Sequence, residues 1–75
     1  MHDFKRGDRV AHDSPAAGTA TGRVVRLYSE REIATHAKTH GPEAAAKLPE
    51  WIVCEMTDAH GTFKLAFHHS SLRRV

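Results

Sequence analysis

Apolar and polar residues alternate most regularly in the last third of the chain, where they predict two strands joined by a hairpin. The polar residue Glu55 lies between apolar neighbours in Trp51–Met56, so alternate side chains of this strand are predicted to face the core. Asp58–Gly61 has the composition of a hairpin turn, with its glycine near the left-handed position. In the first strand the inward positions are Ile52, Cys54 and Met56, and the opposite face carries Trp51, Val53 and Glu55. The return strand is Thr62–Phe67. It alternates in the same way, with Phe63, Leu65 and Phe67 on one face and Thr62, Lys64 and Ala66 on the other.

The first third of the chain predicts two more strands. Arg9–His12 is a short strand, closed by Asp13–Pro15 and a loop to Gly18 whose proline and glycine favour turn conformations. Thr19–Tyr28 is rich in Thr and Val and forms the next strand. Gly22 lies within it, where a bulge or a sharp bend is expected to curl the strand, as a small barrel requires.

The end of the chain completes the predicted sheet. His69–Leu72 has the pattern of a helical turn, and Arg73–Val75 is predicted to form a last short strand that pairs near the N-terminus. A chain of 75 residues buries only about 60% of its unfolded surface and supports a single core. We therefore predict one mainly β domain over residues 1–75, a small SH3-like or Tudor-like five-stranded barrel.

Residues 29–48, between the second and third strands, predict a helical insertion. Ser29 and Glu32 form a capping box, in which each side chain accepts a hydrogen bond from the backbone amide of the other. The helix should end near His40, because a glycine and Pro42 follow. Pro42 suits the first position of a second short helix that stops before Pro49. Structured segments longer than the usual loop of about 2–6 residues are often functional.

Short motifs occur through most of the chain outside this insertion. They are Phe4-x-x-Gly7-Asp8-x-Val10, Gly22-x-Val24-Val25, the Gly61 turn, and a closing segment with Ala66, His68 and Leu72-x-x-Val75. Together they resemble the bacterial hypervirulence-associated protein Tudor domain family, small SH3-like barrels with no established activity. The Gly-Asp-x-Val opening recurs in many SH3-like barrels, so the resemblance implies that architecture.

The same opening and hairpin are also similar to the plasmid-borne type II dihydrofolate reductases, short SH3-like chains that form a tetramer around one pore. That family has a Val-Gln-Ile-Tyr strand in its pore. The corresponding strand here, Phe63–Ala66, lacks both the amide and the phenol. No catalytic residue carries over, and we do not expect that activity.

The charge of the chain gives little indication of a nucleic-acid partner. Eleven Lys and Arg against nine Asp and Glu leave a formal net charge of +2, and the two signs are mixed along the chain. Seven histidines add positive charge only below neutral pH.

The single cysteine and the absence of long apolar runs predict a cytoplasmic protein without a membrane partner. Cys54 has no second cysteine with which to form an internal disulfide, and it lies in an apolar run where a thiol behaves as a small hydrophobic group. No run approaches the roughly 20 apolar residues of a membrane span, and no signal peptide is apparent.

Histidines supply the main candidate chemistry. Glu32, His36 and His40 are spaced by four, so they share one stripe of the predicted helix, where the two histidines form an i, i+4 pair suited to one metal ion. His68 and His69, with His60 in the adjoining turn, form a second group. The simpler interpretation, which we favour over metal binding, is that both groups are exposed polar positions. The helix lacks the glutamate of a His-Glu-x-x-His protease motif, so no catalytic metal or other cofactor is expected.

No other residues predict catalysis. Cys54 is expected to face the core, where a thiol is inert. Ser70 and Ser71 are explained as caps of the terminal turn, and the five scattered glycines form no phosphate-binding loop. Without a nucleophile, base and oxyanion-stabilising group, the chain is not predicted to be an enzyme.

Binding residues are easier to find than catalytic ones. Tyr28 and Trp51 flank the insertion and either share an exposed groove or pack at its hinge. A methyl-lysine cage requires several aromatic residues, and the core takes some of the few present. A basic patch beside the two aromatic residues would suit nucleic acid, although Glu30, Glu32 and Glu55 oppose it. Its members are Arg23, Arg26, Lys64, Arg73 and Arg74.

Two functional hypotheses follow. The favoured one is a non-enzymatic interaction module that binds a protein segment or nucleic acid through an aromatic and basic groove. The alternative is a metal- or pH-responsive, histidine-rich module that controls self-association. Pairing of two barrels into a homo-oligomer also stays open, because so small a core with long edge strands gains stability from a second copy.

Overall fold

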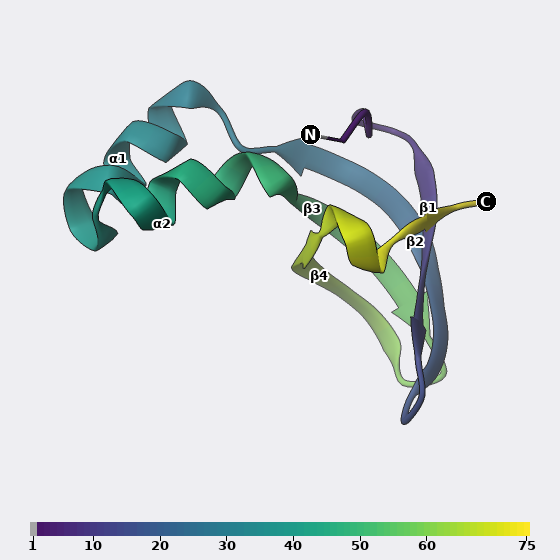
Figure 1. Cartoon of the computed structure of the whole chain (residues 1–75). Helices are drawn as coiled ribbons and strands as arrows, with labels where there is room; N and C mark the ends of the chain where they lie inside the picture. The colour runs from purple at the N-terminus through teal and green to yellow at the C-terminus, as the bar shows by residue number, and fades with distance from the viewer. Residues whose placement is uncertain (1) are drawn as a thin grey trace.

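A curved antiparallel sheet forms most of the molecule (Figure 1). The computed structural model describes residues 2–75. The strands are β1 (Arg9–Ser14), β2 (Gly18–Leu27), β3 (Trp51–Asp58), β4 (Gly61–His68) and β5 (Arg73–Arg74). Their order across the sheet is β4-β3-β2-β1-β5. The predicted mainly β, five-stranded architecture is therefore confirmed.

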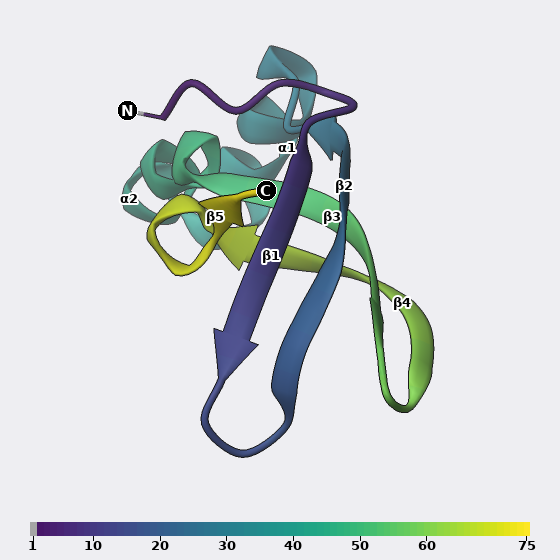
Figure 2. The same ribbon diagram turned by 90° about the vertical axis from the view of Figure 1, so that its right-hand side faces the viewer.

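The sheet curls but does not close into a barrel in the described part of the chain. β5 pairs with β1, at Val10↔Arg74 and Ala11↔Arg73, which confirms that the last strand returns to the N-terminal part of the chain. β4 pairs with β3 and forms the opposite edge. Figure 2 shows the hairpins β1–β2 and β3–β4 splayed apart at their tips.

The insertion contains the two predicted helices. α1 (Glu30–His40) begins with the predicted capping box: the Glu32 amide donates to the Ser29 hydroxyl and the Ser29 amide donates to the Glu32 carboxylate, both at 3.2 Å. Gly41 ends α1 with φ 92°, a conformation that favours glycine, and α2 (Pro42–Lys47) follows with its proline in the first turn. The 3₁₀ turn η1 (Leu48–Glu50) then leads into β3, so helical structure extends to Glu50.

The insertion projects from the end of the sheet and does not pack on its face (Figure 1). α1 has no buried residue, and Ala45 in α2 is the buried residue of the helical pair. α1 and α2 mainly contact each other. The helices therefore depend on caps and on small side chains more than on a hydrophobic core.

The hydrophobic core lies on one face of the sheet. Ile52, Cys54 and Met56 are completely buried, as their alternation with Glu55 predicts. Val10, Ala20, Val24, Phe67 and Leu72 complete the buried cluster, and Phe4 and Phe63 pack against it. Leu65 shares the face of its β3 partner Cys54 but is 54% exposed, because it lies on β4, an edge strand of the sheet.

β2 has two separate local features, a bulge and a close contact with β3. The register with β3 shifts between Val24 and Arg26, so the bulge lies at Val25. The sequence had suggested either a bulge or a sharp bend at Gly22, and the bulge is not there. Gly22 instead allows a close approach of β3, because a Cβ atom there would overlap the carbonyl oxygen of Glu55.

Several strand ends also differ from the sequence-based expectation. β1 extends two residues beyond His12 and β3 two beyond Met56, because main-chain pairing continues into the polar residues near each turn. Gly61 pairs with Asp58 as the first residue of β4, and its φ of 129° lies outside the left-handed helical range expected there.

Candidate functional site

Aromatic side chains line a hollow where the insertion meets the sheet. Its volume is about 240 Å³, and its walls are His2, Phe4, Leu27, Tyr28, Pro49 and Trp51. Tyr28 follows the last residue of β2, and Trp51 begins β3. The two aromatic residues that flank the insertion in sequence thus border the same hollow. We call it the aromatic hollow.

The N-terminal segment is fixed to this hollow by His2. The Nε2 atom of His2 lies 2.8 Å from the carbonyl oxygen of Pro49, and the Phe4 amide donates to Nδ1 at 3.2 Å. These two contacts assign the His2 proton to Nε2 in the neutral ring. Leu27 and Trp51 remain 39% and 38% exposed, so the hollow presents large apolar surface to solvent.

The predicted basic patch is divided among separate ion pairs. Arg73 donates two hydrogen bonds to the carboxylate of Asp13, at 2.8 and 3.3 Å. Arg74 bridges Asp3 and Asp8, each at 2.8 Å, and its guanidinium lies 4.5 Å from the centre of the Phe4 ring. These contacts neutralise the two C-terminal cations that the sequence offered for phosphate binding.

Of the five cations in the predicted basic patch, Arg26 contacts Tyr28, which is a wall of the aromatic hollow. It pairs with Glu32, and its guanidinium lies 5.3 Å from the centre of the Tyr28 ring. Hydrogen bonds from Arg26 and from the Ser29 amide lower the pKa of Glu32. Tyr28 and Glu32 also border a second hollow of about 410 Å³, against α1.

The remaining predicted cations, Arg23 and Lys64, lie on either side of Glu55. The register places Arg9, Arg23, Glu55 and Lys64 in one row across β1, β2, β3 and β4. Arg9, Arg23 and Glu55 line a hollow of about 420 Å³ together with threonines. The structure therefore does not bring the five cations together beside Tyr28 and Trp51.

The predicted helical metal group is only partly assembled. The rings of His36 and His40 lie on one stripe of α1, as their spacing predicts, with their centres 4.4 Å apart and their planes tilted by 39°. The carboxylate of Glu32 is engaged by Arg26 and by the cap of α1. Within residues 2–75, this triplet does not form a group of three converging ligand atoms.

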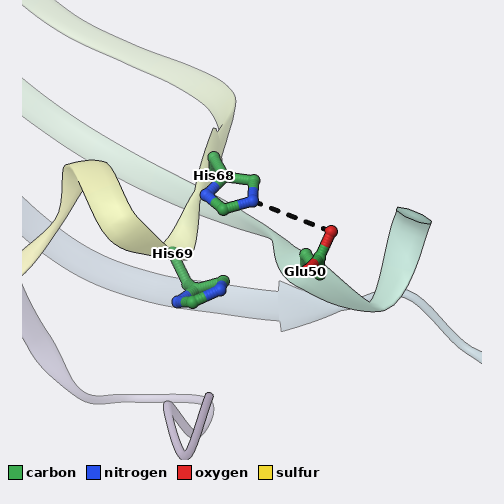
Figure 3. A group of neighbouring side chains, drawn as sticks. All are labelled: Glu50, His68 and His69. Carbon is green, nitrogen blue, oxygen red and sulfur yellow. Dashed lines mark ion pairs between the residues drawn. The ribbon is translucent and has the colours of Figure 1, made fainter. Parts of the chain in front are cut away.

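A different group does converge. One ligand atom from each of Glu50, His68 and His69 lies within 4.8 Å of the others. Figure 3 shows the His68 ring turned toward the Glu50 carboxylate, with Nε2 and Oε2 3.8 Å apart. The expected third member, His60, lies in the turn before β4, at the opposite end of that strand from His68. We call Glu50, His68 and His69 the histidine–glutamate group.

The register of the hairpin explains this group. Trp51 pairs with His68 across β3 and β4, so the preceding Glu50 lies beside the His68–His69 turn. The pairing Asp58↔Gly61 fixes this register, and counting back from the predicted turn identifies Trp51 and His68 as partners. The sequence therefore contained the signal for Glu50, although it was not among the predicted ligands.

Neighbouring groups orient both histidines. Nδ1 of His68 lies 2.7 Å from the Ser70 hydroxyl. The rings of Trp51 and His68 meet edge to face, with their centres 5.5 Å apart. His69 stacks on His68 at 4.6 Å and contacts the His2 ring at 5.5 Å. Partial desolvation, together with His68 and His2, lowers the pKa of His69, which favours its neutral form.

The thiol is buried as the sequence predicts, whereas the terminal turn is capped by His68 and not by the serines that were expected to cap it. Cys54 is completely buried, and burial raises the pKa of its thiol to about 11. The side chain of His68 caps η2 (His69–Ser71), the predicted helical turn, by accepting from the Ser70 amide at 3.2 Å. Ser71 donates to the carbonyl oxygen of His68 at 2.8 Å.

No protein-family model, no curated protein and no solved structure matches this chain. Among residues 2–75, no helix has the length and apolar character that a membrane crossing requires.

Proposed function

We propose that this chain is a non-enzymatic interaction module with an SH3-like, Tudor-like fold, which binds an extended protein segment in the aromatic hollow. The curled five-stranded antiparallel sheet, with its last strand returning to the first, supports the SH3-like assignment. The resemblance to the hypervirulence-associated protein Tudor domain family adds to it.

One observation carries the proposal: Tyr28 and Trp51 border the same exposed hollow. The hollow also has a proline wall and a third aromatic wall from Phe4. Flat aromatic walls on a rigid sheet suit extended or polyproline segments, whose apolar side chains fit between the rings and whose ordering cost is small. Trp and Tyr supply much of the affinity in such contacts.

The distribution of charge favours a protein segment over nucleic acid. Arg26, Arg73 and Arg74 are each paired with a carboxylate. Binding phosphates with these residues would require those pairs to be broken, which offsets the gain from releasing counterions. The aromatic rings are therefore the more effective binding surface.

Selection from a displayed library of proline-containing peptides tests the proposal. The chain has one tryptophan, so the fluorescence of Trp51 reports binding of a selected peptide at the hollow itself. We expect an affinity that changes less than about threefold between 0.05 and 0.5 M NaCl, because phosphate-type binding changes by orders of magnitude over this range. Trp51→Ala should reduce the affinity at least tenfold, since such aromatic hot spots contribute about 2 kcal/mol or more.

The variant Arg73→Ala is the matched control and should leave peptide binding intact, because Arg73 pairs with Asp13 and does not line the aromatic hollow. A single-stranded DNA oligonucleotide serves as the competing probe. Strongly salt-dependent DNA binding that is lost in the arginine variant and kept in Trp51→Ala would overturn the proposal in favour of a nucleic-acid surface.

A further inference from the structure

Two segments that are distant in sequence meet at the histidine–glutamate group. Glu50 ends η1, where the insertion returns to the sheet, whereas His68 ends β4 and His69 begins η2. We propose that Glu50, His68 and His69 form a binding site for one divalent transition-metal ion of the zinc type. This site is separate from the helical group Glu32, His36 and His40.

The donor set matches the chemistry of such an ion. Zinc binds imidazole nitrogen and carboxylate oxygen at about 2.0–2.2 Å, so tetrahedral ligand atoms lie about 3.4 Å apart. Nε2 of His68 and Oε2 of Glu50 are already 3.8 Å apart, and every pair of donor atoms is within 4.8 Å. Small rotations of these surface side chains, 34% and 48% exposed for His68 and Glu50, bring the atoms into coordination distance.

Ser70 supports this role for His68. Its hydroxyl lies 2.7 Å from Nδ1, on the opposite side of the ring from the Nε2 atom that faces Glu50. Metal-binding histidines typically donate their second N–H to an oxygen atom of this kind, which fixes the ring and its tautomer. When Nε2 binds the ion, the proton of the neutral ring resides on Nδ1 and is donated to the Ser70 hydroxyl.

The Ser70 amide explains how the same ring is held without metal. It donates to Nδ1 at 3.2 Å, which requires the proton of the neutral ring to be on Nε2, toward Glu50. Metal binding therefore moves the imidazole proton from Nε2 to Nδ1. The Ser70 hydroxyl, already 2.7 Å from Nδ1, then changes from donor to acceptor, and the Ser70 amide loses its bond to this nitrogen. No oxidant or reductant takes part.

The site also adjoins the aromatic hollow. Trp51 follows Glu50 directly, and its ring contacts that of His68 edge-on. His2, another wall of the hollow, contacts the His69 ring. A bound ion therefore holds the start of β3, the end of β4 and one side of the hollow in a single arrangement.

Zinc titration of the untagged chain, freed of metal with a chelator, tests the site. We expect one equivalent to bind in competition with a chromophoric chelator, and Co²⁺ to give the visible absorption of a four- or five-coordinate ion. Glu50→Gln and His69→Ala should each weaken zinc binding at least tenfold, and Ser70→Ala by about tenfold, since losing an orienting partner costs about 10–100-fold. Mass by light scattering should not change with zinc, because all three ligands come from one chain.

The double variant His36→Ala, His40→Ala is the matched control, with the same residue type on the projecting helix, and should bind zinc normally. Imidazole ¹⁵N spectra give a readout specific to His68: zinc should shift Nε2 and place the proton on Nδ1. Circular dichroism verifies that each variant is folded. Unchanged zinc affinity in folded Glu50→Gln and His69→Ala, or loss of affinity in the helical variant alone, would overturn the assignment.

Discussion

The backbone of β2 at Gly22 lies so close to Glu55 in β3 that no side chain fits between them. A Cβ atom on Gly22 would overlap the Glu55 carbonyl oxygen and approach Cα of Met56 to 2.8 Å. The contact therefore depends on the absence of a side chain, and the obstructing atoms belong to main chain that cannot rotate away.

Gly22→Ala is expected to destabilise the fold severely. Separating β2 from β3 disturbs the pairing that joins the two hairpins of the sheet, and we expect a loss of at least about 2 kcal/mol in the free energy of unfolding. Urea denaturation measures it. Gly18→Ala is the control: Gly18 has φ 79° but no atom near an added Cβ, so only about 1 kcal/mol should be lost. Equal losses in both variants would disprove the close-contact explanation.

The ion pair between Arg73 and Asp13 should make stability depend on pH in the acid range. Hydrogen bonds from Arg73 and Thr19 lower the pKa of Asp13 from 3.8 to about 2 in the folded chain. Because the folded pKa is the lower one, the stabilisation is complete above about pH 4 and is lost as the pH falls toward 2. Asp3, Asp8 and Glu32 have lowered pKa values as well and act in the same direction.

Thermal unfolding between pH 5 and pH 2 measures this effect. The melting temperature should fall steadily on acidification, and Asp13→Asn should show a shallower fall because one of the contributing carboxylates is missing. An identical pH profile for the variant would show that the Asp13 contact has no influence on stability.

Ser29→Ala should unfold α1 without unfolding the sheet. Loss of an N-cap costs about 1 kcal/mol, and α1 has no buried side chain to compensate for it. We expect lower helical ellipticity and faster amide exchange in α1. The midpoint of urea unfolding of the sheet, followed by the fluorescence of Trp51, should not change. A midpoint lowered to the same extent as the helicity would mean that helix and sheet unfold together.

Cys54 should resist thiol reagents as long as the chain is folded. Raising its pKa from 9.0 to about 11 reduces the thiolate fraction about 100-fold, and complete burial blocks access as well. A chromogenic disulfide reagent should react at the rate of unfolding in buffer and immediately in concentrated urea. Rapid reaction in buffer would contradict the inward orientation of Cys54.

Local pattern predicted most of the secondary structure but not the pairing of charges. The alternation around Glu55 identified the buried residues of β3, and Ser29 identified the start of α1, because each depends on neighbours in sequence. Arg74 and Asp8 are 66 residues apart, and their contact depends on how β5 returns to β1. Composition alone suggested a basic patch where the fold forms ion pairs.

The same limit explains the histidines. The spacing of His36 and His40 revealed that they are neighbours, since both lie on one stripe of a helix. Glu50 and His68 meet only through the register of a hairpin. Leu65 shows the same limit for burial. The alternation of β4 places it on the core face as predicted, but it is exposed because β4 is an edge strand, and the order of strands in a sheet cannot be read from a local pattern.

The insertion leaves β2 after Leu27 and returns to β3, where Leu27 pairs with Ile52. The two ends of the excursion are therefore held together by the sheet itself, and the closure entropy of a loop rises only slowly with its length. The number of helical turns between them is consequently almost free to vary during evolution. A lineage of such chains can lengthen, shorten or replace the helical pair while inheriting the same sheet, and it can diversify its contacts through this one segment.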